Sequence, residues 1–314
     1  AACLGGVPLI ILGGSQTWHA TRTILQAGVG HDVFGTLGCN KQLLAFADVA
    51  WAPSAGGAHG MAPQGILSAG RCGHELPLDS QNITPPEPIV LDRTGAPVPS
   101  AASLDRRSAR ARLTFVDVRF PADARAAVED HVLPMLRAAS TGPAPGLRAV
   151  LYVDLGGVWY RNCIVEGWCG GREDLEWVHR RYLEEAERTR GRRGHAARNM
   201  ACAAVEEIFA DEMKGLVAAL ERLCGPELGT PPADYGVPVR IGCLVGNAHQ
   251  SAGWAEPVLR RLRPVGEAFL RPLVQRGLVH PVDNKALLAS ALKAENQGGH
   301  WSHVMNAWIA SNML

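Results

Sequence analysis

The segment ARNMACAAVEEIFADEMKGLVAALERL, residues 197–223, contains the clearest helical periodicity in the chain. Its apolar side chains recur at steps of three and four residues, which places them along one face of an α-helix. Cys224, Gly225 and Pro226 end the pattern, because glycine favours the C-terminal cap and proline cannot continue a helix. The apolar face consists of Ala197, Met200, Ala201, Ala204, Val205, Ile208, Met213, Leu216, Val217 and Leu220.

Further helices are predicted on both sides of this segment. Residues 172–189 have a charged helical pattern, and 284–294 form a helix that Asp283 caps. Residues 254–274 have helical spacing but contain three prolines, which predicts short or kinked helices. An apolar stripe from residue 301 to 313 predicts a terminal helix. The second half of the chain is therefore rich in helices.

Strands are predicted where β-branched and aromatic residues cluster. Residues 147–155 and 158–165 flank Gly156-Gly157, and a two-residue glycine loop favours a primed turn between antiparallel strands. This predicts a β-hairpin over 147–165. Residues 113–120 and 237–245 are predicted to be single strands, and a helix is predicted to start at Pro121.

The first half of the chain is rich in glycine and proline. The apolar run 7–12 predicts a core strand, and short helices are predicted at 17–27 and 41–49. Six prolines between 77 and 102 predict an extended arm with one hairpin at 89–98.

These elements predict an α+β fold, with a helix-rich second half, short antiparallel hairpins and an irregular first half. The predicted regions are 1–145, a Gly/Pro-rich mixed region that includes the arm 77–102, and 146–314, a hairpin plus helices. A single continuous domain is the alternative to this division.

Composition excludes several classes of protein. Hydrophobic residues make up 47% of the 314 positions and charged residues 19%, a balance that favours a buried core over extended disorder. The net charge of +1 creates no global field toward nucleic acid or an anionic membrane, so any such contact is local. No nucleotide-binding glycine motif is complete, and no cofactor is predicted.

The predicted enzyme site is a loop just after the strand 237–245. His249 is the candidate general acid or base, and Asn247 and Gln250 are the candidates that orient a substrate. Cys163 and Cys169 are candidate nucleophiles, with His179 and His195 nearby in the sequence. A loop histidine and buried cysteines without a chemical role are the alternative interpretations.

No metal site is predicted, and the candidate ligands that come nearest to one are three residues of the first half. His59, Cys72 and His74 offer imidazole and thiolate ligands, both of which zinc accepts, with Cys39 or Glu75 as a fourth ligand. Their spacing differs from that of zinc fingers and ribbons. Ordinary hydrogen bonding in a loop is the alternative interpretation.

Two further segments are predicted to bind partners. Arg190, Arg192 and Arg193 lie in an arginine-rich stretch that suits phosphates or an acidic partner, whereas a solvated loop between helices is the alternative. The terminal stripe is predicted to be an interface, because exposed apolar patches usually mark contact surfaces. Its residues are Trp301, Val304, Met305, Trp308 and Ile309.

The sequence favours a structural assembly protein, most plausibly a virus capsid (shell) subunit or a large piece of one. Low charge, apolar ends and abundant arginine support this hypothesis. Its partners would be copies of itself or neighbouring shell subunits, together with non-specific nucleic-acid contact through the arginines and no membrane. The alternative is a soluble hydrolase or transferase that uses the loop histidine or the His/Cys site. The eight cysteines are scattered through a chain large enough to fold without disulfide bonds, and no signal peptide is recognised. Both features favour an intracellular, cytoplasmic location, or a virion.

Overall fold

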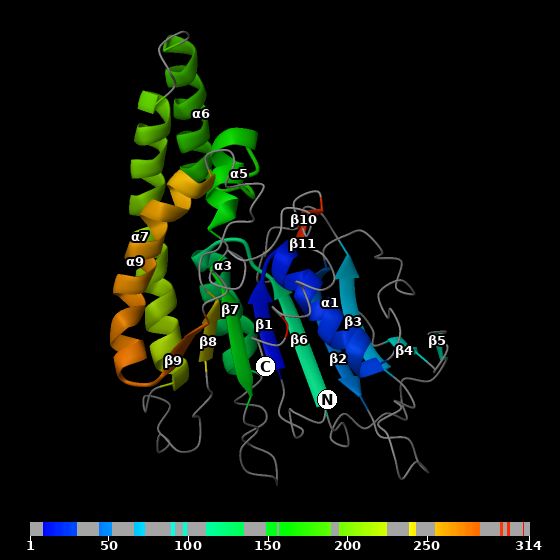
Figure 1. Cartoon of the computed structure of the whole chain (residues 1–314). Helices are drawn as coiled ribbons and strands as arrows, with labels where there is room; N and C mark the ends of the chain where they lie inside the picture. Colours follow the sequence, from blue (N-terminus) through cyan, green and yellow to red (C-terminus); the bar gives the residue numbers. More distant parts are fainter. Residues whose placement is uncertain are drawn as a thin grey trace.

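The computed structural model describes residues 9–29, 44–51, 66–72, 89–91, 97–98, 111–134, 149–155, 157–189, 195–224, 239–242, 255–282, 296–297, 300–301 and 310. Within these ranges, nine strands form one sheet in the order β5-β4-β3-β2-β6-β1-β7-β8-β9 (Figure 1). The strands are β1 (Leu9–Gly13), β2 (Leu44–Trp51), β3 (Ile66–Cys72), β4 (Ile89–Leu91), β5 (Pro97–Val98), β6 (Ala111–Asp117), β7 (Val150–Asp154), β8 (Val239–Gly242) and β9 (Val279–Val282).

The sheet has a parallel part and an antiparallel part. Strands β6, β1, β7, β8 and β9 are parallel neighbours, whereas β2, β3, β4 and β5 pair antiparallel with one another and with β6. The fold is therefore mixed α/β. The antiparallel hairpin predicted at 89–98 is confirmed, because β4 pairs with β5.

The hairpin predicted over 147–165 is wrong. Its first half is β7, but residues Val158–Glu166 form the helix α5, and β7 pairs in parallel with β1 and β8. Tyr160, Cys163 and Ile164 of α5 are buried, which is a helical spacing of three and four residues. Burial of that face outweighs the strand propensity of the valines and aromatic residues around it.

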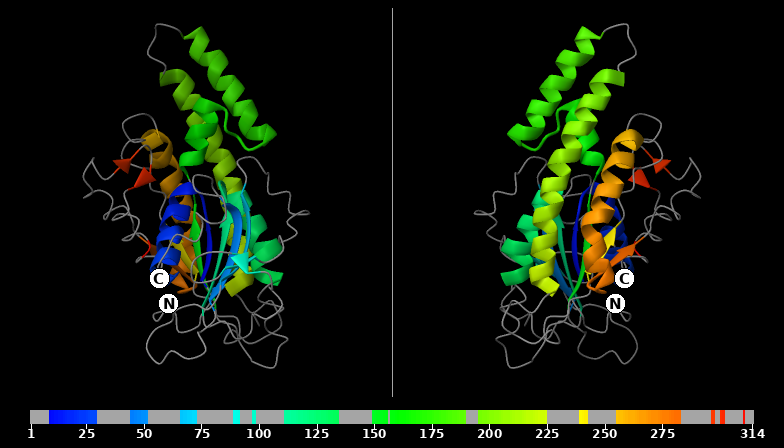
Figure 2. Two further views of the ribbon diagram at one scale, coloured as in Figure 1. Left: turned by 90° about the vertical axis from the view of Figure 1, so that its right-hand side faces the viewer. Right: turned by 90° about the vertical axis from the view of Figure 1, so that its left-hand side faces the viewer.

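Helices cover both faces of the sheet. They are α1 (Ser15–Val29), α3 (Pro121–Ala127) with its π-helical continuation η4 (Val128–Val132), α5, α6 (Glu173–Arg188), α7 (His195–Cys224) and α9 (Ala255–Gln275). Helices α1 and α3 lie on opposite faces of the sheet (Figure 2). The helices predicted at 172–189 and 197–223 are confirmed as α6 and α7, whereas the helix predicted at 41–49 is wrong because β2 occupies this segment.

Side chains of β1 alternate between the two helical layers, as the period of two in a strand requires. Ile10 and Leu12 join the large core cluster beneath α3 and α7, together with Val116 of β6. Phe115, the neighbour of Val116, turns to the other face and contacts the ring of Trp18 on α1 at 5.0 Å. All of these residues are buried, so β1 is a central strand with helices on both sides.

Helix α9 is one continuous helix of 21 residues, although Pro264 and Pro272 lie inside it. Each interior proline costs about 3 kcal/mol because it lacks an amide donor and crowds the preceding turn. A face of buried leucines and Val258 packs against α7 and offsets this cost. Of the predicted short or kinked helices, the short ones are therefore wrong, because one helix runs through both prolines. Among the described helices, none is both long and apolar enough to cross a membrane.

Candidate functional site

The carboxyl ends of β1, β6 and β7 meet in the middle of the sheet. Strand pairing places Gly13 opposite Asp117 on one side, and Leu12 opposite Val153 on the other, so Asp154 is the next residue beside Gly13. The chain leaves β1 for α1 on one face and leaves the adjacent β6 for α3 on the other face. Such a point, where neighbouring parallel strands send their connections to opposite faces, is where open α/β sheets bind ligands.

The turn between β1 and α1 depends on Gly13. A Cβ atom at this position would lie 2.6 Å from three side-chain atoms of Thr17, so only glycine lets the first turn of α1 approach the strand. Thr17 Oγ1 donates a hydrogen bond to Asp154 Oδ2 at 2.5 Å. The close approach therefore joins α1 to the end of β7.

Asp117, the last residue of β6, is a buried acid with unused hydrogen-bonding capacity. The residue is 9% exposed, and Oδ2 lies 3.6 Å from Arg119 Nε. Oδ1 is buried and has no hydrogen-bond partner among the described residues. Burial raises the pKa of Asp117 to about 7, while the Arg119 charge opposes the rise and the Asp123 carboxylate adds to it.

Arg119 and Trp159 border the same turn. The Arg119 guanidinium lies over the Trp159 ring, 4.9 Å from its centre. The indole nitrogen of Trp159 lies 2.7 Å from the position that a Cβ of Gly14 would occupy. The backbone of β6 is also tied to β1 here, since the Val118 amide donates to the Gly13 carbonyl at 3.2 Å. The site thus has an aromatic and cationic side next to its acids.

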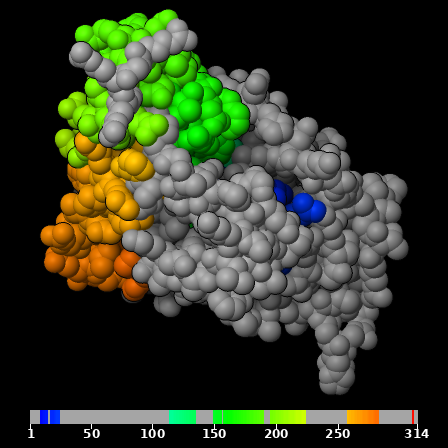
Figure 3. Space-filling model, turned by 45° about the horizontal axis from the view of Figure 1, so that its top comes forward, coloured from blue at the N-terminus to red at the C-terminus, as the bar shows by residue number. Residues whose placement is uncertain are grey.

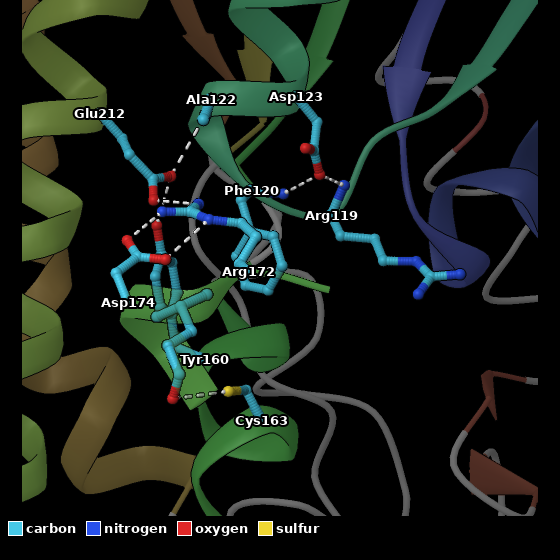
Figure 4. Close-up of polar contacts among 10 residues, drawn as sticks. Arg119, Phe120, Ala122, Asp123, Tyr160, Cys163, Arg172, Asp174 and Glu212 are labelled. Atoms are coloured by element: carbon cyan, nitrogen blue, oxygen red, sulfur yellow. Dashed lines mark hydrogen bonds and ion pairs between the residues drawn. The ribbon is translucent and has the colours of Figure 1, made fainter. Parts of the chain in front are cut away.

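Two carboxylates, the half-buried Asp123 and the buried Glu212, hold the segment from Arg119 to Asp123, which we call the β6–α3 turn (Figure 4). Asp123 Oδ2 accepts the backbone amides of Arg119 and Phe120, each at 3.0 Å. Glu212 of α7 accepts the Ala122 amide at 3.2 Å. Burial raises the pKa of both carboxyls, and these donors oppose that rise.

Glu212 also joins a wider polar cluster. It accepts the Tyr160 hydroxyl at 2.7 Å and an ion-paired hydrogen bond from Arg172, which also binds Asp174. Figure 4 shows this cluster on one side of Phe120, while the Arg119 side chain extends away from it.

Cys163 and Cys169, the candidate nucleophiles, form a disulfide bond and are both buried. Neither is a free thiol, so the prediction of a cysteine nucleophile is wrong for this pair. The bond closes the short loop between α5 and α6. Cys202 is a free cysteine in the described part of the chain, and burial raises the pKa of its thiol.

Most other residues singled out from the sequence lie outside the described ranges. Trp301 is in the short strand β11 (His300–Trp301), which pairs with β10 (Asn296–Gln297), and Cys72 is the last residue of β3. Among the described residues, no three His, Cys, Asp or Glu side chains are placed to hold a metal ion. The predicted residues outside the description are His59, His74, Arg190, Arg192, Arg193, Asn247, His249, Gln250, Val304, Met305, Trp308 and Ile309.

Sequence reasoning missed the site around Asp117. A partial signal was present, because Asp117 lies within the predicted strand 113–120 and Gly13-Gly14 separates the core strand from a predicted helix. No protein-family model, no curated protein and no solved structure matches this chain.

Proposed function

We propose that the chain is a hydrolase or transferase that binds a small molecule at the carboxyl ends of β1, β6 and β7. Asp117 transfers a proton in this reaction. The observation that supports the proposal is a buried carboxyl at the topological switch point, with one oxygen that no described residue engages. Figure 3 shows atoms of the β1–α1 segment at the surface on the upper face of the molecule.

The chemistry follows from the surroundings of Asp117. A carboxyl that titrates near pH 7 is present in both protonation states at neutral pH, which suits a general acid or base. Its Oδ1 atom, which no described residue engages, accepts a hydrogen bond from a hydroxyl, an amine or an attacking water of the bound reactants. Arg119, 3.6 Å away, stabilises the ionised carboxylate and any negative charge that develops beside it.

This proposal keeps the enzyme alternative of the sequence analysis but assigns it to different residues. The loop histidine and the His/Cys site remain predictions, because the histidines of both lie outside the described ranges. The capsid-subunit hypothesis also remains a prediction. Its arginine segment and most of its terminal stripe are likewise outside those ranges.

The proposal is tested with two chromogenic substrates, p-nitrophenyl acetate for acyl transfer and p-nitrophenyl phosphate for phosphoryl transfer. We expect turnover of one of them, with an apparent pKa near 7 in the pH–rate profile. Asp117→Asn should lower the rate by about 10² to 10⁴, as the loss of a general acid or base does.

Asp211→Asn is the matched control, since Asp211 is an exposed acid of α7 and undergoes the same chemical change. Its rate should equal that of the unsubstituted protein. An absence of turnover with both substrates, or equal rates in the two variants, would overturn the proposed role of Asp117.

A further inference from the structure

We propose that Arg172 and Glu212 are positioning residues for the Asp117–Arg119 site. They hold the β6–α3 turn, which begins two residues after Asp117 and carries Arg119. The inference rests on the proposed function for its relevance to catalysis, but it concerns contacts that can be tested without any substrate.

The turn begins with two amides held by its own acid. Asp123 Oδ2 accepts the amides of Arg119 and Phe120, so the backbone directly after Val118 is fixed. The same carboxylate is near enough to Asp117 to raise the pKa of that residue. The direction of the chain as it leaves β6 therefore depends on where Asp123 is placed, at the start of α3.

Glu212 places the start of α3. Ala122 is in the first turn of this helix, where amides have no partner within the helix. Its amide donates instead to Glu212 Oε2, a carboxylate 90 residues further along the chain on α7. Because the same carboxylate also accepts the Tyr160 hydroxyl, α3, α5 and α7 meet at one group that is 8% exposed.

Arg172 contacts both Glu212 and Phe120, the second residue of the β6–α3 turn. Its guanidinium pairs with Glu212 and Asp174, and it lies over the Phe120 ring, 5.3 Å from the ring centre. The other contact of this ring is an edge-on packing against Tyr160 at 5.0 Å. Phe120 is thus held between a cation and a second aromatic ring, which suits the charge distribution of its π-system.

Charges alternate along this path, from Glu212 through Arg172 to Asp123, and then through Arg119 to Asp117. The pairs Arg172–Asp123 and Arg119–Asp123 are close enough to lower the pKa of Asp123. Asp154, with its Thr17 partner, lies on the other side of Gly13 from Asp117. Loss of the Glu212 charge releases Arg172 from its partner and loosens the turn, which admits water to Asp117.

The test is the titration of Asp117 in Glu212→Gln, followed by carboxyl ¹³C NMR and assigned with Asp117→Asn. We expect the midpoint to fall by at least about one pH unit from the starting value near 7, because hydration of Asp117 in the loosened turn favours its ionised form. In the p-nitrophenyl assay, the apparent pKa of the rate should fall with it.

Leu216→Ala is the matched control on the same helix. Leu216 is fully buried and apolar, so its truncation lowers the melting temperature without touching the polar path. The Asp117 midpoint should stay near 7 in this variant. An unchanged midpoint in Glu212→Gln would overturn the positioning role even if activity is found. A shifted midpoint without turnover of either substrate would overturn the proposed function alone.

Arg172→Lys provides a second measurement if Glu212→Gln does not fold. Lysine keeps the positive charge but loses the fork that binds Glu212 and Asp174 together. We expect hydrogen exchange at the Arg119 and Phe120 amides to quicken at least tenfold. An amide of β7, such as that of Val153, is the internal reference. Equal protection in both proteins would refute the role of Arg172.

Discussion

The burial of Asp117 has a direct consequence for how the stability of this protein depends on pH. A free aspartate titrates near pH 3.9, whereas burial raises the pKa of Asp117 in the folded chain to about 7. The folded state therefore keeps a proton that the unfolded state releases between these two values. The contribution of Asp117 to stability therefore decreases as the pH rises from about 4 to 7, and it is constant above and below that range.

We predict that Asp117→Asn removes this pH dependence. The stability of the variant relative to the unsubstituted protein should rise by up to about 4 kcal/mol between pH 4 and pH 8, because asparagine is neutral throughout. Urea unfolding of both proteins at pH 4, 6 and 8 measures the difference, and the other titrating groups cancel in it. A difference that stays constant across this range would show that Asp117 is ionised in the folded protein at all three values.

The hydrogen bond between Thr17 and Asp154 was not predictable from the local sequence around either residue. Thr17 and Asp154 form a hydrogen bond across 137 positions, and their meeting depends on β7 pairing in parallel with β1. A strand pattern gives the faces of a strand but not its neighbour or direction. The glycines at 13 and 14 predict a turn from the sequence alone. Glycine is required there because Thr17 and Trp159 approach the backbone closely, and these contacts form only in the folded structure.

At the scale of elements, long periodic segments were predictable and short apolar ones were not. Helices α6 and α7 have many turns in which the helical period repeats. The nine residues of α5 form only about two turns, so the helical period hardly repeats, and they are rich in valine and aromatic residues, which favour strands. The glycine pair before them has the sequence of a hairpin turn. The prediction of a helix at 41–49 was wrong because β2 is stabilised by pairing with β3 and β6, and local propensity does not reveal these neighbours.

The face that α7 buries is rotated slightly from the predicted one. Phe209 was absent from the predicted stripe but is fully buried, and its ring packs edge-on against Tyr160 at 5.7 Å. Ile208 was placed at the centre of the stripe but is only partly buried at the margin of the core. The alanines of this helix made the phase of the stripe ambiguous, because alanine is compatible with either face.

We predict that Phe209→Ala costs about 3–5 kcal/mol of unfolding free energy, as truncation of a fully buried aromatic ring does. Ile208→Ala should cost only about 1–2 kcal/mol, because part of its side chain is already in contact with water. Chemical denaturation measures the loss of unfolding free energy in each variant, provided that the dependence of this free energy on denaturant concentration is the same in both. A larger loss for Ile208→Ala would mean that the helix presents the predicted face after all.

At the scale of the whole molecule, α6 and α7 form a pair that projects beyond the sheet (Figures 1 and 2). The start of α6 packs into the core through Leu175 and Val178. Trp168, just before this helix, and Trp177, on it, are 57% and 52% exposed. Two large aromatic side chains in water, one just before α6 and one in its first half, favour contact with a partner.

We predict that copies of the chain associate through this projecting pair of helices and the arginines at 190, 192 and 193 that connect them. Light scattering after size exclusion at micromolar concentration should give a mass above the 33.5 kDa of one chain.

Joint substitution of the three arginines by glutamine should lower that mass. A salt concentration of about 0.5 M should also lower it, because exposed ion pairs are screened within a few ångströms at high ionic strength. Trp168→Ser with Trp177→Ser should lower it at any salt concentration, since apolar contacts are not screened. Asp117→Asn should leave the mass unchanged, which separates association from the site at the sheet edge. A mass of 33.5 kDa at every concentration would refute the association, and a mass that responds only to the tryptophan substitutions would remove the arginines from the interface.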